Sequence, residues 1–287
     1  KDWDQYLLDR FDIPKEILPE CVSTKYQYGE IRVNDASIPL TVVTGDQSAA
    51  MYAYGNLQFE TAYVNIGTGA FISRPSGYAL MYARRLLTSV IYSNETENQY
   101  VIEGTVNGAG SAIDWVQSQM PVENLWEQLP IWLKTITNPP LFLNGVSGLG
   151  APYWLADFES ELDLEADAAA SYVAVIESIV FLIHANVQEM MKFASPPEQL
   201  QISGGLAKLD GLCQRLADLA RLPVYRPVEC EATARGTAYL VADKPDQWPE
   251  NQHGVWFEPN NNAILDKRFL LWEQAMLQRM RHTESDS

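Results

Sequence analysis

The spacing of apolar and polar positions predicts a chain in which short strands are mixed with helices. Apolar, β-branched runs at 40–44, 63–66 and 70–73 have the length of strands, whereas apolar positions at helical spacing predict a long helix over 168–193. Further strands are predicted at 89–92, 100–103, 141–143, 200–203 and 224–226, and further helices at 111–120, 122–135, 208–219 and 231–242. This arrangement predicts an α/β fold with a mixed sheet flanked by helices.

The stretch from Leu40 to Gly55 carries the first candidate chemistry. Residues 40–44 are predicted to form a buried strand, Gly45 interrupts the apolar run, and Asp46 stands where the N-cap of a helix over 47–54 would lie. A carboxylate at such a strand-to-helix turn lies at the mouth of an α/β site. Helix capping alone also accounts for an aspartate here, so the pattern leaves both interpretations open.

A glycine-rich turn, Gly67-Thr68-Gly69, joins the predicted strands at 63–66 and 70–73. Glycines let the backbone approach a phosphate closely, and backbone N–H groups together with the Thr68 hydroxyl can then bond the phosphate oxygens. Taken alone, a Gly-x-Gly hairpin is more often only a turn. The pair Gly204-Gly205 follows the predicted strand at 200–203 and precedes a helix, which favours contact with a phosphate or a ribose.

Together these motifs resemble the C-terminal half of the FGGY carbohydrate kinases, and glycerol kinases most closely. The resemblance runs from about residue 1 to about residue 280. It is carried by Gly-Asp-Gln at 45–47, by the glycine turn, by Ser-Gly-Leu-x-Ala-Pro-Tyr-Trp at 147–154, by Ile-Ser-Gly-Gly at 202–205 and by Leu-Pro-Val-x-Arg-Pro at 222–227.

The resemblance implies a fold and an activity. The fold is that of a ribonuclease-H-like domain of the actin-like ATPase superfamily. The activity of the complete enzyme is ATP-dependent phosphorylation of a polyol or sugar hydroxyl, with ATP and Mg²⁺ as cofactors and with glycerol favoured. Alternatives are a pentulose or heptulose kinase of the same family, and a stand-alone, non-catalytic nucleotide-binding or scaffolding remnant. Since no Asp-x-Gly-Thr occurs in the chain, the family's N-terminal kinase domain is expected as a missing partner, and the isolated chain is expected to be inactive.

The same resemblance assigns roles to individual residues. It makes Asp46 the catalytic base and a neighbour of Mg²⁺, directly or through water, because an alcohol is a poor nucleophile until a carboxylate takes its proton. Gln47 and Phe71 would lie beside the substrate, although a hairpin core residue is an equal interpretation of Phe71. Leu209 and Asp114 stand where glycerol kinases carry Asn and Gln, which puts the base and ribose contacts in doubt. The residues expected to bind ATP are Gly67, Thr68, Gly69, Gly110, Gly204, Gly205 and Leu209.

The resemblance also divides the chain. Residues 1–22 resemble the end of the family's N-terminal domain and its linker, residues 23–245 the C-terminal nucleotide-binding domain, and residues 246–287 a C-terminal extension with a final helix. That last segment keeps Phe-Glu-Pro at 257–259 together with Arg268 and Trp272.

Composition refines the picture by exclusion. The net charge of −17 and a pI near 4.5 disfavour nucleic acid and anionic membranes, which need a basic face. Three cysteines without zinc spacing suit a reducing compartment, and three scattered histidines predict no metal site. The longest apolar run, 173–183, is broken by Glu177 and Ser178 and is too short for a membrane span. We therefore expect a cytoplasmic protein without nucleic-acid or membrane partners, and a homodimer stays open.

Overall fold

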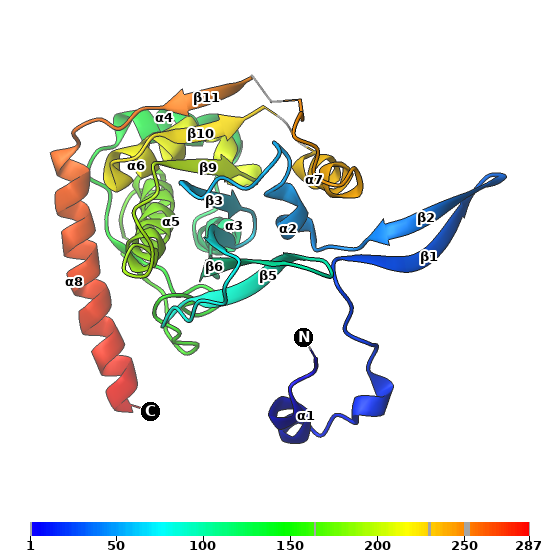
Figure 1. Ribbon diagram of the computed structural model, residues 1–287. Coiled ribbons are helices and arrows are strands. Elements are labelled where there is room, and N and C mark those ends of the chain that lie inside the picture. Colours follow the sequence, from blue (N-terminus) through cyan, green and yellow to red (C-terminus); the bar gives the residue numbers. More distant parts are fainter. Residues whose placement is uncertain (1, 164, 229–230, 250–252, 287) are drawn as a thin grey trace. The chain divides into compact units, whose positions relative to one another are not determined.

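The computed structural model describes residues 2–163, 165–228, 231–249 and 253–286 (Figure 1). The chain forms two compact units, each assembled from three separate segments. Unit 1 comprises Lys1–Asn56, Val90–Tyr100 and Glu231–Glu250, and unit 2 comprises Leu57–Ser89, Val101–Cys230 and Asn251–Ser287.

A seven-stranded sheet, mostly within unit 2, has the strand order β11-β10-β9-β3-β4-β6-β5. Strand β3 pairs antiparallel with β4 and parallel with β9, so the sheet is mixed, as predicted. The strands are β3 (Thr61–Ile66), β4 (Ala70–Gly77), β5 (Leu87–Ser93), β6 (Asn98–Val106), β9 (Gln199–Ser203), β10 (Val224–Pro227) and β11 (Gly254–Phe257). The segment that forms β11 carried no strand signal in the sequence pattern.

The helices of unit 2 supply most of its core. They are α3 (Gly110–Gln119), α4 (Leu125–Thr135), α5 (Ala168–Met190), α6 (Asp210–Ala220), α8 (Ala263–Asp286) and the short 3₁₀ helix η2 (Gly205–Lys208). A small antiparallel pair, β7 (Phe142–Leu143) with β8 (Glu161–Leu162), completes the unit.

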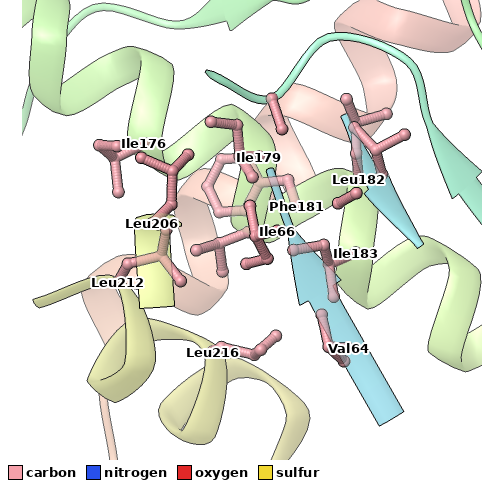
Figure 2. Packing of buried hydrophobic residues seen from close by; sticks show 14 of the residues in the cluster. Val64, Ile66, Ile176, Ile179, Phe181, Leu182, Ile183, Leu206, Leu212 and Leu216 are labelled. Carbon is pink, nitrogen blue, oxygen red and sulfur yellow. The ribbon is translucent and has the colours of Figure 1, made fainter. Parts of the chain in front are cut away.

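Helix α5 is the central core helix, and every side chain from 171 to 187 is buried. Figure 2 shows its apolar residues among those of β3 and α6, for example Ile179 with Ile66 and Leu212. Within the described part of the chain, α5 alone is long and apolar enough to cross a membrane, but most of that stretch is buried inside the molecule. A helix that is apolar on all sides is suited to such a position in a protein core.

The glutamate that interrupts the apolar run of α5 is part of a buried ion pair. Glu177 is only 3% exposed, and its carboxylate lies 2.7 Å from Nη2 of Arg268 on α8 and 3.5 Å from Nε of Arg215 on α6. Trp272, also on α8, donates its indole N–H to the carbonyl oxygen of Phe142 at 3.0 Å. Because a buried charge without its partner is costly, these contacts fix the C-terminal helix on the core.

Unit 1 contains a long two-stranded hairpin and several short helices. Its elements are α1 (Gln5–Phe11), the 3₁₀ helix η1 (Lys15–Ile17), β1 (Lys25–Val33), β2 (Ala36–Val42), α2 (Asp46–Ala50) and α7 (Ala232–Val241). Strands β1 and β2 pair antiparallel in a sheet of their own, the blue ribbon of Figure 1.

The prediction of a buried strand over 40–44 is wrong. Strand β2 ends at Val42, belongs to the two-stranded sheet and exposes most of its side chains. Apolar, β-branched residues favour an extended backbone whether or not a second layer covers them, so the pattern could not distinguish the two cases. The helix prediction needs a correction as well. Gly45 is the N-cap, Asp46 is the first residue of α2, and the helix ends at Ala50.

His184 makes the stability of this core depend on pH. Its ring, 8% exposed, packs edge-on against Phe269 with ring centroids 4.9 Å apart. Burial lowers the pKa of His184 from 6.5 to about 4. Between these two values the unfolded chain binds a proton that the folded chain does not, so the free energy of unfolding falls as the pH is lowered.

We predict that the wild-type chain loses about 3 kcal/mol of stability through His184 between pH 6.5 and pH 4, at about 1.4 kcal/mol per pH unit. His184→Leu removes the titrating group and should remove this component of the pH dependence. Urea denaturation of both proteins at pH 7, 5 and 4 measures it. Equal losses in the two proteins would contradict the assignment.

Candidate functional site

The turn at residues 67–69, between β3 and β4, is fixed by the start of α3. The carbonyl oxygen of Gly67 accepts a hydrogen bond from the amide of Gly110 at 3.0 Å, and that of Thr68 accepts one from the amide of Ser111 at 3.1 Å. The first amides of a helix have no acceptor within the helix. Here the turn supplies the acceptors, and the turn is itself held in one conformation.

Close packing accounts for two glycines of this arrangement. A Cβ atom on Gly110 would lie 2.7 Å from the carbonyl oxygen of Gly67, and one on Gly69 would lie 2.8 Å from that of Val106. Both distances are shorter than a Cβ atom tolerates. By contrast, among the described residues no acceptor faces the amides of Thr68 and Gly69. These two N–H groups are left for water or for a ligand.

A second glycine turn leaves the same edge of the sheet. Strands β3 and β9 are parallel neighbours with Asn65 opposite Ser203, so the turns that follow them emerge side by side. Gly204 has φ of +95°, and a Cβ atom there would lie 2.4 Å from the carbonyl oxygen of Ile66. Around Gly205 a Cβ atom would meet nothing within 4 Å. The fold therefore requires glycine at 204, but packing within the chain does not require it at 205.

The two turns line one cavity of about 520 Å³, a size usual for small-ligand sites. Helix α3 contributes Gly110 and Asp114, which lie one helical turn apart, and α4 contributes Trp126 and Pro130 at the same spacing. The region of η2 completes the lining. The lining residues are Gly67, Thr68, Gly110, Asp114, Trp126, Pro130, Gly205, Leu206, Lys208 and Leu209. Exposed backbone at three glycines thus meets apolar side chains, which suits a ligand with an anionic part and a flat apolar part.

Most residues expected to bind ATP gather at this cavity. Of these, Gly67, Thr68, Gly110, Gly205 and Leu209 line it, whereas Gly69 and Gly204 belong to the same two turns without being part of the lining. Four lining residues were not predicted from the sequence: Trp126, Pro130, Leu206 and Lys208. Trp126 and Pro130 are four residues apart on α4, and this spacing was the available signal that they share a face. An ordinary buried helix face has the same spacing, so the signal did not indicate a cavity.

Arg226 supports the part of the cavity around η2. Its guanidinium donates to the carbonyl oxygen of Ala207 at 2.7 Å, lies 2.9 Å from the carboxylate of Asp210 and stands over the ring of Phe257 at 5.1 Å. Nearby, burial raises the pKa of the Cys213 thiol to about 12, so this cysteine stays protonated. These contacts hold the turn after β9 against α6.

Asp46 and Gln47 lie in unit 1 and are not part of this lining. The hydroxyl of Thr233 on α7 donates to the backbone oxygen of Asp46 at 3.1 Å. A Cβ atom on Gly236 would lie 1.7 Å from the carbonyl oxygen of Ala49, so α7 packs closely on α2. This packing holds the backbone at Asp46 while its side chain stays exposed.

Phe71 occupies β4 opposite Asn65 and is not part of the cavity lining. Its side chain is 39% exposed, so Phe71 is not the core residue that one of the two interpretations required. Its proximity to a substrate stays a prediction.

Metal ligation by side chains alone finds no support in the part of the chain that the structure describes. No group of three or more histidine, cysteine, aspartate or glutamate residues is placed there to hold a metal ion.

Comparison with known proteins identifies relatives over nearly the whole chain. Residues 62–242 match the family model described as the C-terminal domain of the FGGY family of carbohydrate kinases. A glycerol kinase from Trichodesmium erythraeum is 30% identical over 301 residues, which cover 96% of this chain and 59% of that protein. A glycerol kinase from Thermococcus gammatolerans is 32% identical over 297 residues, covering 97% of this chain and 59% of that protein.

Solved structures share the fold. The crystal structure of Plasmodium falciparum glycerol kinase with ADP superimposes with a TM-score of 0.80 at 20% identity, covering 97% of this chain and 59% of that one. The chain therefore spans about 59% of the length of the relatives it matches.

The two adjacent glycines give a matched pair of substitutions. We predict that Gly204→Ala destabilises the chain by at least about 2 kcal/mol, because a side chain there is strained and overlaps backbone atoms. Gly205→Ala should change the free energy of unfolding by less than about 0.5 kcal/mol, since the new methyl group meets open space. Urea denaturation of both variants measures this. Equal destabilisation would contradict the described geometry of the turn.

Proposed function

The chain belongs to the FGGY family of carbohydrate kinases, and from this premise we propose that it is the nucleotide-binding part of an enzyme that transfers the γ-phosphoryl group of ATP to a polyol or sugar hydroxyl. The observation that carries the proposal is the cavity at the two glycine turns. Its lining combines accessible backbone at glycines with the Thr68 hydroxyl and an apolar surface. Phosphates need close backbone approach and N–H donors, and a nucleobase needs an apolar slot.

The cavity fits a nucleotide in several respects. The unpaired amides of Thr68 and Gly69 can donate to phosphate oxygens. Gly205 leaves room that no chain atom fills. The Asp114 carboxylate can accept hydrogen bonds from ribose hydroxyls, since it is an acceptor only. ADP in the Plasmodium falciparum relative supports the choice of a nucleotide as the occupant.

Asp46 is proposed as the general base of the transfer. Its carboxylate is exposed at a backbone position held by α7, so it is available to a substrate hydroxyl without being buried in the chain. Removing the hydroxyl proton as the phosphoryl group arrives makes the oxygen a competent nucleophile. Gln47 and Phe71 are proposed as neighbours of that substrate.

We propose Asp46 as a ligand of Mg²⁺, although the described residues form no group of three or more ligand side chains. The ion commonly binds through one or two carboxylates, substrate phosphates and water, so Asp46 is a sufficient protein ligand, directly or through a water molecule. When bound, Mg²⁺ would neutralise part of the phosphate charge. The remaining contacts would come from the nucleotide.

Glycerol is the favoured acceptor because the sequence relatives described above are glycerol kinases. The part of the relatives that this chain does not span is proposed to be an N-terminal kinase domain that completes the acceptor site. The isolated 287-residue chain is therefore expected to bind nucleotide without phosphorylating glycerol. If the enzyme phosphorylates a pentulose or heptulose and not glycerol, the proposed acceptor is wrong, whereas the assignment to the FGGY family is unaffected.

Asp46→Asn in a protein that includes the N-terminal domain tests the catalytic role. We predict that this variant loses about 10²–10⁴ in kcat with glycerol and ATP, the usual contribution of a general base. Its Kd for ADP should stay within about two-fold of the wild-type value, because Asp46 is not part of the nucleotide cavity. A coupled assay of ADP release and isothermal titration calorimetry measure the two quantities.

Asp35→Asn is a matched control, since Asp35 is an exposed aspartate in the β1–β2 turn. It should leave kcat unchanged. Wild-type turnover by Asp46→Asn would remove Asp46 from the mechanism.

A further inference from the structure

In the described part of the chain the Trp126 side chain makes neither a hydrogen bond nor an aromatic ring contact, unlike the other seven tryptophans. Each of those donates an indole hydrogen bond or packs against another aromatic ring. Trp126 does neither and is 57% exposed, yet it lines the nucleotide cavity. A large apolar ring left open at the edge of a cavity is suited to stacking on a flat ligand.

The surroundings of Trp126 extend this flat surface. Pro130 follows one helical turn later on α4, so both side chains lie on the same face of the helix and line the cavity. Leu206 and Leu209 add buried apolar side chains from the region of η2. A nucleobase in this part of the cavity would therefore meet mainly apolar atoms.

Groups that could distinguish one purine from another are scarce in this lining. It contains no side-chain amide. The amides of Ala207 and Leu209 donate within the turn, to Gly204 and Leu206, and the carbonyl oxygen of Ala207 already accepts from Arg226. Telling adenine from guanine requires directional hydrogen bonds to the base, and the backbone near η2 has few left to offer.

The two charged lining residues do not discriminate either. Lys208 is exposed, and its flexible ammonium group can donate to N7 of either purine without fixing the bidentate contact to N7 and O6 that selects guanine. The Asp114 carboxylate is the acceptor proposed for the ribose hydroxyls, which leaves it unavailable to the base. Selection by charge or by hydrogen bonding is therefore weak, whereas stacking is available to every purine.

We propose that Trp126 holds the base of the nucleotide by stacking, and that the cavity accepts adenine and guanine nucleotides without a strong preference. The inference rests on the proposed nucleotide-binding function and adds to it the recognition residue and the range of the phosphoryl donor. Trp126 acts on nucleotide affinity. The proposed general base, Asp46, acts on the acceptor hydroxyl and does not line this cavity.

Titration of the 287-residue chain with ADP and GDP tests this inference by calorimetry and by quenching of tryptophan fluorescence. We expect Kd values for ADP and GDP within about five-fold of each other. Trp126→Ala should raise both by about ten-fold, which is the usual effect of removing one base-stacking ring. Trp126→Phe should recover most of the loss, since a flat ring is kept. Trp256→Ala is the matched control, because Trp256 is similarly exposed but does not line the cavity.

The outcomes separate this inference from the proposed function. Binding of one of the two nucleotides that is more than about five-fold tighter than binding of the other overturns the lack of base preference only. Unchanged affinity for both nucleotides in Trp126→Ala, with an unchanged fold by circular dichroism, overturns the stacking role only. Failure of both nucleotides to bind the wild-type chain overturns the proposed function and this inference with it.

Discussion

The hydrogen bonds between the turn at 67–69 and the start of α3 are the constraint on which the site depends. The carbonyl groups of the turn satisfy the first amides of the helix, so both segments are fixed at once. This close approach excludes a side chain at Gly110. It also determines what remains for a ligand, because the helix amides are used and the amides of Thr68 and Gly69 are not. The anion-binding capacity proposed here therefore lies in the turn rather than in the helix N-terminus.

The core determines where that turn emerges. Apolar side chains of α5 pack against those of β3 and fix the strand (Figure 2). The parallel pairing of β3 with β9 then brings the turns after both strands to one edge of the sheet. The side of the cavity formed by η2 is steadied by Arg226, and the C-terminal helix is fixed by the buried pair of Glu177 with Arg268. Apolar burial supplies the framework, and a few polar contacts fix η2 and α8 on it. Between these fixed elements lies the cavity, which is lined by glycine backbone and apolar side chains.

Much of this could be predicted from the sequence, and the failures have identifiable causes. The mixed α/β class, the hairpin of β3 and β4, and helix α5 followed from periodicity and from the family resemblance. The strand before Asp46 was misjudged because β-branched residues do not reveal whether another layer covers them. Strand β11 was missed because its four residues gave no alternating pattern. Trp126 was missed because its four-residue spacing from Pro130 on α4 is that of any amphipathic helix. Which residues of different elements share a cavity depends on the register in which strands such as β3 and β9 pair. The apolar pattern within one segment does not show which strand it pairs with.

The central claim is that a nucleotide binds at the two glycine turns, and amide chemical shifts test it most directly. Titration of the ¹⁵N-labelled chain with ADP should shift the amide signals of Thr68, Gly69 and Gly205 most strongly, while those of Gly29 in unit 1 and Val255 on β11 stay in place. Shifts confined to other parts of the chain, with the Thr68 and Gly69 signals unchanged at saturating ADP, would contradict the account.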